Sequence, residues 1–171
     1  MEVRKVKITD AERLVELIGE VEKTSDHMLF EANERKISVE QFRKRIKSFG
    51  QDASIILVAE EQDDLVGYLM VLAGSSNRTK HSAYLVIGIS EKYRGQGIGS
   101  QLFKQLDRWA IEYPIHRLEL TVMVGNFAGI ALYKKNGFEI EGVKKDSLKV
   151  NGEYVDEYYM AKAYLILFRN F

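Results

Sequence analysis

Cysteine is absent from this chain of 171 residues. Without cysteine the chain cannot form a disulfide, a thiolate metal site or a cysteine-linked covalent intermediate. A chain of this length buries about 70% of the surface that its unfolded form exposes, so one hydrophobic core is enough to hold it together. We therefore expect a single domain over residues 1–171 that needs no cross-link.

The chain also lacks an excess of charge and any long hydrophobic run. Lys and Arg together number 25, as do Asp and Glu, which argues against binding nucleic acid or a membrane surface through bulk charge. No stretch approaches the roughly 18 consecutive apolar residues of a membrane helix, and the first residues do not resemble a secretory signal. His27, His81 and His116 have no metal-ligand spacing. We expect a cytoplasmic protein with no metal and no nucleic-acid or membrane partner.

Two helices are predicted in the first third of the chain. Asp10 can cap a helix whose apolar residues recur at helical spacing. These residues are Leu14, Leu17, Ile18 and Val21. Residues 24–37 have no clear period and are expected to form a loop. Ser38 and Gln41 then have the spacing of a capping box at the start of a second helix.

Seven strands and two further helices complete the prediction. A helix that begins near Gly99 ends before Pro114, and a short helix covers about 127–136. Asn151-Gly152 is a strong signal for a type I′ turn between the last two strands. The strands are expected at residues 2–8, 54–61, 65–73, 82–89, 116–124, 138–150 and 154–163. The order predicts a three-layer α/β fold, in which helices cover the faces of a mixed sheet.

Three glycines, Gly95, Gly97 and Gly99, fall within five residues between a predicted strand and a predicted helix. Such a junction presents unpaired backbone N–H groups at a helix N-terminus, where the helix dipole favours anions. Glycine has no Cβ to keep the backbone away from phosphate oxygens. With Arg94 beside them, residues 95–100 are predicted to bind a phosphate group. The alternative is a glycine-rich turn that only allows close packing of the helix.

Two common nucleotide-binding motifs do not fit this segment. A Walker loop requires GxxxxGK[ST], and residues 95–101 lack both its spacing and its lysine. A dinucleotide-binding GxGxxG motif requires glycine where Ser100 stands, and an acidic residue at the end of the following strand, which ends Val122-Met123-Val124. A dinucleotide-dependent oxidoreductase is therefore only a third hypothesis.

The pattern that remains is Arg-x-x-Gly-x-Gly, from Arg94 to Gly99. A second motif follows, in which Asn126 precedes Ala128, Ala131-Leu132-Tyr133 and Gly137-Phe138. Together the two motifs resemble the signatures of the Gcn5-related N-acetyltransferase (GNAT) superfamily. The later segment is similar to the branch that acetylates ribosomal-protein N-termini, polyamines or amino acids. The resemblance implies the acyl-CoA N-acyltransferase fold, with a mostly antiparallel sheet, and acetyl-CoA as the acyl-donor substrate.

The resemblance also implies roles for individual residues. Tyr133 falls on the general acid of the family, and Asn126 is expected to bind the pantetheine arm, to cap its helix, or both. Backbone groups around Ile87 and Ile89 are expected to pair with the pantetheine like an extra strand and to offer an amide to the oxyanion. The expected cofactor-binding residues are Ile87, Gly88, Ile89, Arg94, Gly95, Gln96, Gly97, Ile98, Gly99, Ser100, Asn126 and Tyr133.

The general base is not identified by the sequence. Some members of the family carry a glutamate five residues before the conserved asparagine, and here that position is Thr121. Glu119 and Glu31 are the candidates, with Glu60 a further possibility, and each is better explained as a solvated or salt-bridged surface carboxylate. A chain of water molecules to solvent is the remaining alternative.

These observations predict an N-acetyltransferase in which a primary amine attacks the thioester directly in a ternary complex. The alternative is a non-catalytic acyl-CoA-binding sensor or scaffold. The loop at 24–37 and the hairpin at 142–154 are expected to flank a small-molecule or peptide amine, and Arg35, Lys36 or Arg78 could meet an acceptor carboxylate. Tyrosines at 154, 158, 159 and 164 and the apolar segment 165–168 indicate sheet packing or a homodimer surface.

Overall fold

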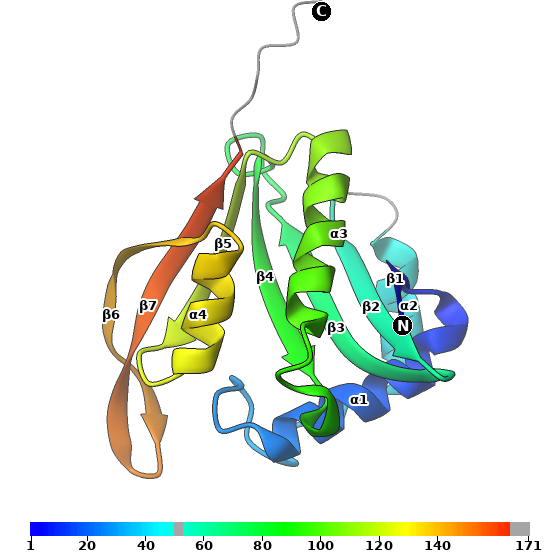
Figure 1. The fold of residues 1–171 in the computed structure, drawn as a ribbon, viewed down its shortest axis with the longest axis horizontal. Helices are drawn as coiled ribbons and strands as arrows, with labels where there is room; N and C mark the ends of the chain where they lie inside the picture. Colours follow the sequence, from blue (N-terminus) through cyan, green and yellow to red (C-terminus); the bar gives the residue numbers. More distant parts are fainter. Residues whose placement is uncertain (50–52, 165–171) are drawn as a thin grey trace, which may run out of the picture.

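The computed structural model describes residues 1–49 and 53–164, which form one seven-stranded sheet in the order β1-β2-β3-β4-β5-β7-β6 (Figure 1). Its strands are β1 (Glu2–Lys5), β2 (Ile55–Glu61), β3 (Asp64–Ala73), β4 (Ser82–Ile89), β5 (Arg117–Met123), β6 (Glu139–Val150) and β7 (Glu153–Ala163). Only β4 and β5 pair in parallel, and the other neighbouring strands are antiparallel. The predicted mixed, mostly antiparallel sheet is confirmed. A dinucleotide-binding fold, whose sheet is mostly parallel, is excluded.

Helices cover both faces of this sheet, as predicted. Helices α1 (Ala11–Thr24) and α2 (Val39–Ser48) pack on one face, and α3 (Ile98–Glu112) and α4 (Phe127–Lys135) pack on the other (Figure 1). Two short 3-10 turns, η1 (Ile8–Asp10) and η2 (Glu91–Tyr93), complete the order. Among the described residues, no helix combines the length and the apolar composition needed to cross a membrane.

The two hydrophobic cores follow from the alternation of side chains along the central strands. On β2, Leu57 faces α3, whereas Ile56 and Val58 face α1 and α2. Both faces of β2 and β3 are covered, which is why these strands have almost continuous apolar sequences. On β5, by contrast, Leu118, Leu120 and Val122 are buried, while the residues between them are only partly covered. One face of β5 is therefore open, with Glu119 and Thr121 on it.

The pairing between β4 and β5 is short. It consists of Ser82 opposite Arg117, Ala83 opposite Leu118, and Tyr84 opposite Glu119. Beyond these pairs β4 stays with β3, β5 stays with β7, and the two strands diverge (Figure 1). We call the space between residues 85–89 of β4 and 120–123 of β5 the fork. Its edges carry backbone N–H and C=O groups that can pair with a strand-like ligand.

Two predicted details at the N-terminus are wrong. The first strand ends at Lys5 and not at residue 8, because residues 8–10 form η1. Asp10 precedes α1, but its carboxylate does not cap that helix. The carboxylate instead accepts the N–H of Lys7 at 2.7 Å and hydrogen bonds from Arg4 at 2.7 and 3.0 Å and from Arg13 at 2.6 Å. The buried carboxylate of Asp10 thus binds two guanidinium groups in place of the backbone N–H groups at the start of α1.

Other predicted details are confirmed. The Ser38 side chain accepts the N–H of Gln41 at 3.3 Å and caps α2. Asn151 and Gly152 have φ values of 50° and 85°, as a type I′ turn requires. Tyr164 packs against the core and donates its hydroxyl to Asp107 at 2.6 Å. The apolar segment 165–168 lies outside the described residues.

The Asp10 ion pairs yield a prediction for stability. Burial alone would raise the pKa of Asp10, but hydrogen bonds from Arg4, Lys7 and Arg13 lower it from 3.8 to about 2. Asp10→Ala removes a buried partner of Arg4 and is expected to lower the free energy of unfolding by about 3 kcal/mol near neutral pH. Because the pKa of Asp10 is lower in the folded protein, its carboxylate stabilises the fold fully only at pH values above the ordinary pKa of 3.8. The difference in unfolding free energy between wild type and Asp10→Ala should therefore narrow as the pH falls through about 2.

Urea unfolding at a series of pH values measures this difference. Glu40→Ala is the control, because Glu40 forms an exposed ion pair with Arg43 at 3.4 Å and should change stability by under about 0.5 kcal/mol. A loss for Asp10→Ala that stayed constant between about pH 5 and pH 2 would contradict the ion-pair explanation.

Candidate active site

The glycine-rich loop between β4 and α3 has the backbone geometry expected of an anion-binding site, and we call residues 95–100 the cradle. Gly95 and Gly97 have φ values of 74° and 83°, in the left-handed region that favours glycine. A Cβ added at either position would meet nothing within 4 Å, so the space over the loop is open. Within the described part of the chain, the backbone N–H groups of residues 95–100 find no acceptor. Six unpaired N–H groups and the N-terminus of α3 therefore converge on one open surface.

Two other glycines nearby serve packing instead. A Cβ at Gly99 would lie 2.7 Å from the Cδ2 atom of Leu132, so glycine at this position lets α3 and α4 approach each other. A Cβ at Gly88 would lie 2.5 Å from the ring of Tyr68, which is fully buried behind β4. Both interpretations of the glycine cluster are therefore supported, at different residues.

Arg94 anchors the loop to α1. Its guanidinium donates to the carbonyl of Ile89 at 3.1 Å and to the carbonyl and hydroxyl of Thr24 at 2.9 and 2.8 Å. The carboxylate of Glu20, also on α1, accepts the N–H of Glu91 at 3.0 Å. These contacts hold the loop against the C-terminal end of α1. A direct contact between Arg94 and a phosphate group stays a prediction.

Asn126 caps α4. Its Oδ1 accepts the N–H of Gly129 at 2.9 Å. A Cβ at Gly129 would lie 2.6 Å from Nδ2 of Asn126, so this cap requires a glycine three residues on. In the described structure Nδ2 donates to no acceptor and can bind a ligand. The capping role is thus observed, and it leaves the ligand-binding role open.

Tyr133 lies on α4, where its ring packs edge-on against Phe103 at 6.1 Å and beside Phe138 at the same distance. Burial raises the pKa of Tyr133 to about 12, with a smaller contribution from the nearby Tyr84. The hydroxyl is therefore protonated at neutral pH, as a general acid must be. It has no hydrogen-bond partner among the described residues and can donate to a ligand.

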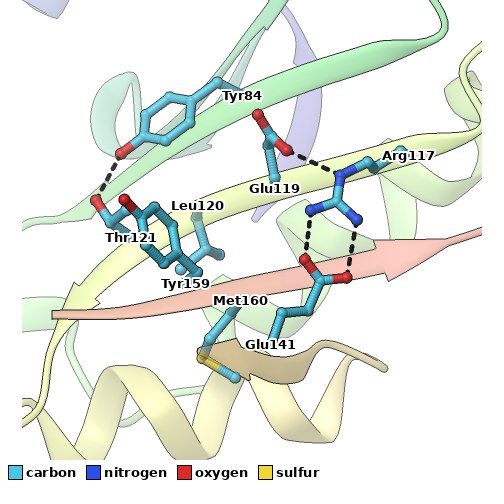
Figure 2. Close-up of a pocket in the computed structure, with 8 residues that line it drawn as sticks. All are labelled: Tyr84, Arg117, Glu119, Leu120, Thr121, Glu141, Tyr159 and Met160. Atoms are coloured by element: carbon cyan, nitrogen blue, oxygen red, sulfur yellow. Dashed lines mark hydrogen bonds and ion pairs between the residues drawn. The ribbon is translucent and has the colours of Figure 1, made fainter. Parts of the chain in front are cut away.

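A cavity of about 270 Å³ lies at the closed end of the fork. Figure 2 shows the side chains that line it. Arg117 donates from Nε to Glu119 at 2.8 Å and with both terminal nitrogens to Glu141 at 2.8 and 2.5 Å. These bonds lower the pKa of Glu141 and raise that of Arg117. The cavity is lined by Tyr84, Arg117, Glu119, Leu120, Thr121, Glu141, Tyr159 and Met160.

Three of these residues were missed by sequence reasoning: Tyr84, Arg117 and Glu141. Tyr84 places a hydroxyl group within the apolar sequence of β4. This polar group is the one feature of the sequence that could have marked Tyr84 as a candidate site residue. Its hydroxyl lies 3.0 Å from that of Thr121 on β5 (Figure 2). Arg117 and Glu141 are 24 residues apart, and only the register of β5, β7 and β6 brings them together.

The three proposed bases occupy different places. Glu119 lines the cavity, but its carboxylate is paired with Arg117. Glu31 is exposed in the loop between α1 and α2. Glu60 accepts hydrogen bonds from Arg13 and Arg4, which lower its pKa. It lies on β2, separated from β4 by β3, and this position removes it from the candidates.

The cations proposed for an acceptor carboxylate differ in the same way. The guanidinium of Arg35 donates to the buried Glu22 at 3.0 and 2.6 Å and lies 4.0 Å from the ring centroid of Phe30. Arg78 is in the turn before β4, at the opposite end of that strand from the cradle. Lys36 is exposed and makes no ion pair with a described residue. Among the described residues, no group of three or more His, Asp or Glu could hold a metal ion.

Comparison with known proteins gives a consistent result. Residues 21–138 match the family model described as the acetyltransferase (GNAT) family. An L-amino acid N-acetyltransferase of Escherichia coli is 40% identical over 110 residues, which are 62% of this chain and 66% of that protein. A protein of Bacillus subtilis described as a putative ribosomal protein bS18-alanine N-acetyltransferase is 33% identical over 57% of this chain and 62% of its own length. The chain thus spans just under two thirds of these relatives.

The crystal structure of a GNAT-family acetyltransferase from Streptococcus pneumoniae has the same fold throughout. It superimposes with a TM-score of 0.91 at 27% sequence identity and covers 95% of this chain and 98% of that one. The acyl-CoA N-acyltransferase fold that the sequence resemblance implied is confirmed.

The cradle yields a prediction that separates strain from binding. Gly97→Ala and Gly152→Ala both force a Cβ into a left-handed backbone with open space around it, and each should cost about 1–2 kcal/mol of stability. Only Gly97→Ala should also weaken the binding of acetyl-CoA, by about tenfold or more, because its Cβ enters the cradle. Calorimetric titration with acetyl-CoA measures the difference. Equal affinity of the two variants would contradict the assignment of the cradle.

Proposed function

The chain belongs to the acetyltransferase (GNAT) family, and from this membership we propose that it transfers an acetyl group from acetyl-CoA to an amine. The observation that carries the proposal is the fork. The cradle follows the end of β4, and α4 with Asn126 and Tyr133 follows the end of β5. The groups expected to bind the donor and to protonate its leaving group therefore lie around one fork, with residues 95–100 and Asn126 at its open end.

The residues fit acetyl-CoA, which supplies the activated thioester when bound. Residues 95–100 would hold the pyrophosphate through their unpaired N–H groups. The free edge of β4 around Ile87 and Ile89 would pair with the pantetheine arm, and Nδ2 of Asn126 would donate to the same arm. The N–H groups of residues 95–100 and Nδ2 of Asn126 are donors that no described residue satisfies, whereas the carbonyl of Ile89 already accepts a hydrogen bond from Arg94 at 3.1 Å.

The catalytic steps that the chain can support follow from its own groups. Attack of a neutral amine on a thioester develops negative charge on the carbonyl oxygen, which a backbone N–H at the edge of β4 can stabilise. The departing thiolate needs a proton, and the hydroxyl of Tyr133 holds one at neutral pH. Because the chain has no cysteine, no acyl-cysteine intermediate can form, and direct attack of the amine in a ternary complex is the mechanism that we propose.

For the acceptor we propose the amino group of an L-amino acid or of a peptide N-terminus. The support is the names of two relatives, one described as acting on L-amino acids and one on a ribosomal-protein alanine. The loop between α1 and α2 and the β6–β7 hairpin both lie toward the open end of the fork, where they can flank an acceptor (Figure 1). A homodimer and a cytoplasmic location remain predictions of the sequence.

A screen of acyl transfer tests the proposed function. We expect release of free thiol from acetyl-CoA to depend on an added amine, in a panel of L-amino acids, polyamines and peptides with N-terminal alanine. An acyl-CoA sensor of the same fold would bind acetyl-CoA, as measured by thermal shift, and release no thiol with any amine. That second result would contradict catalysis while leaving the fold and the cradle intact.

Tyr133→Phe tests the general acid. The substitution keeps the ring that packs on Phe103 and Phe138 and removes only the hydroxyl. We expect kcat to fall about 10²-fold, at the lower end of the range for acid–base groups, with the affinity for acetyl-CoA changed by less than about threefold. Steady-state kinetics and calorimetry measure the two quantities. Unchanged turnover would remove Tyr133 from the mechanism.

A further inference from the structure

A pair of hydroxyl groups closes the fork. The Tyr84 hydroxyl on β4 lies 3.0 Å from the Thr121 hydroxyl on β5 (Figure 2). Tyr84 belongs to the last registered pair of the two strands, opposite Glu119. Thr121 stands two residues farther along β5, on the same face. The Tyr84 side chain therefore leans about 6–7 Å past its own backbone position, into the fork.

This position lies beside the expected reaction centre, on the premise that the proposed function is correct. A strand-like arm that enters the open end of the fork and pairs with β4 must stop where β4 and β5 begin to pair with each other. The Tyr84–Thr121 bridge stands at that point, just beyond the pair of Tyr84 with Glu119. The thioester end of the arm would therefore come to rest next to the two hydroxyl groups.

Tyr84 and Tyr133 approach this point from opposite faces of the sheet. Tyr133 is on α4, in the core shared with α3, whereas the Tyr84 ring lines the open cavity and is 37% exposed. Their proximity shows in the raised pKa of Tyr133, to which Tyr84 contributes. The Tyr133 hydroxyl thus lies on the side of the leaving group, and the Tyr84 hydroxyl lies on the side from which an acceptor in the cavity would approach.

No carboxylate bridges the fork at this point. The titratable groups around Tyr84 are Glu119 and Arg117 on β5, Glu141 on β6, Tyr159 on β7 and Tyr133 on α4. Both carboxylates among them are bound by Arg117, at 2.8 Å from Glu119 and at 2.8 and 2.5 Å from Glu141. The hydroxyls of Tyr84 and Thr121, by contrast, lie within hydrogen-bond distance of each other between β4 and β5.

We propose that Tyr84 is a catalytic residue that relays the proton of the acceptor amine, with Thr121 as its positioning partner. Before the N–C bond forms, the ammonium form of the acceptor amine gives a proton to the Tyr84 oxygen, which leaves the nitrogen neutral for attack. Tyr84 passes its own proton to the Thr121 oxygen, and Thr121 releases its proton to water in the cavity. The C–S bond then breaks, the sulfur takes a proton from Tyr133, and the proton that the acylated nitrogen loses returns Tyr133 to its neutral form through water. One proton leaves to solvent, and both relay hydroxyls end in the state in which they began.

The experiment compares variants that remove one hydroxyl each. Tyr84→Phe is expected to lower kcat/KM for an accepted amine about 10²-fold near neutral pH. The deficit should shrink as the pH rises through the pKa of the acceptor amine, because solvent then delivers the amine already neutral. Thr121→Val should show the same pH-dependent loss, less strongly, and Thr121→Ser should restore most of the activity.

The controls separate catalysis from structure. Tyr113→Phe removes a tyrosine hydroxyl at the C-terminal end of α3 and should leave kcat/KM unchanged. The ring stacks on Trp109 at 4.9 Å and lies 5.7 Å from Nζ of Lys5, and the substitution keeps both contacts. Calorimetry should find acetyl-CoA affinity within about twofold of wild type for Tyr84→Phe. Thermal unfolding of each variant reports whether the fork is disturbed.

Each outcome decides between explanations. A Tyr84→Phe deficit that is the same at every pH, or that comes with weaker acetyl-CoA binding, means a structural bridge and overturns the relay. Full activity of Tyr84→Phe overturns the inference alone, since wild-type turnover still supports the proposed function. Absence of wild-type turnover with every amine tested overturns the proposed function and the inference together.

Discussion

The three-residue parallel pairing of β4 with β5 is the constraint on which the rest of this structure depends. It holds the two halves of the sheet together at one end and lets them part at the other. Each arm of the fork is kept rigid by a different partner, since β4 pairs with β3 as far as Ile89 and β5 pairs with β7 over its whole length. A longer pairing would fill the fork with β5 itself, and a shorter one would divide the sheet.

The helices on the α3 side then fix the groups around the fork. Gly99 allows α4 to pack directly against α3, and Phe103 and Phe138 hold the ring of Tyr133 between them. Asn126 starts α4 immediately after β5, so the strand that forms one arm also sets the position of Tyr133. On the other arm, Arg94 and Glu20 fasten the cradle to α1. The groups expected to bind the donor and to act on it are thus positioned by short connections at the strand ends.

Local sequence information predicted most of the fold and part of the site. The period of apolar residues, the Ser38 cap and the Asn151-Gly152 turn depend on neighbours in the chain, and the structure confirms them. The cradle was also predictable, because a strand, a glycine loop and a helix are consecutive. The Tyr84–Thr121 bridge was not, because it depends on the register of two strands with α3 between them. The Arg117–Glu141 pair could not be predicted for the same reason, since it too depends on strand register. Nor could the sequence show that Arg4 and Arg13 bind Glu60, which the sequence alone allows as a general base.

The contact between Gly88 and Tyr68 means that these two positions, which are distant in the sequence, can change only together. The ring of Tyr68 occupies the volume that any side chain at position 88 would need. The backbone of β4 therefore packs directly against this buried ring at the edge of the fork. A larger residue at 88 becomes tolerable only together with a smaller one at 68, and a smaller residue at 68 alone leaves a void behind the arm. Sequences that drift at these positions must therefore change both together, and a mutant library that randomises only one of them will return the parent residue.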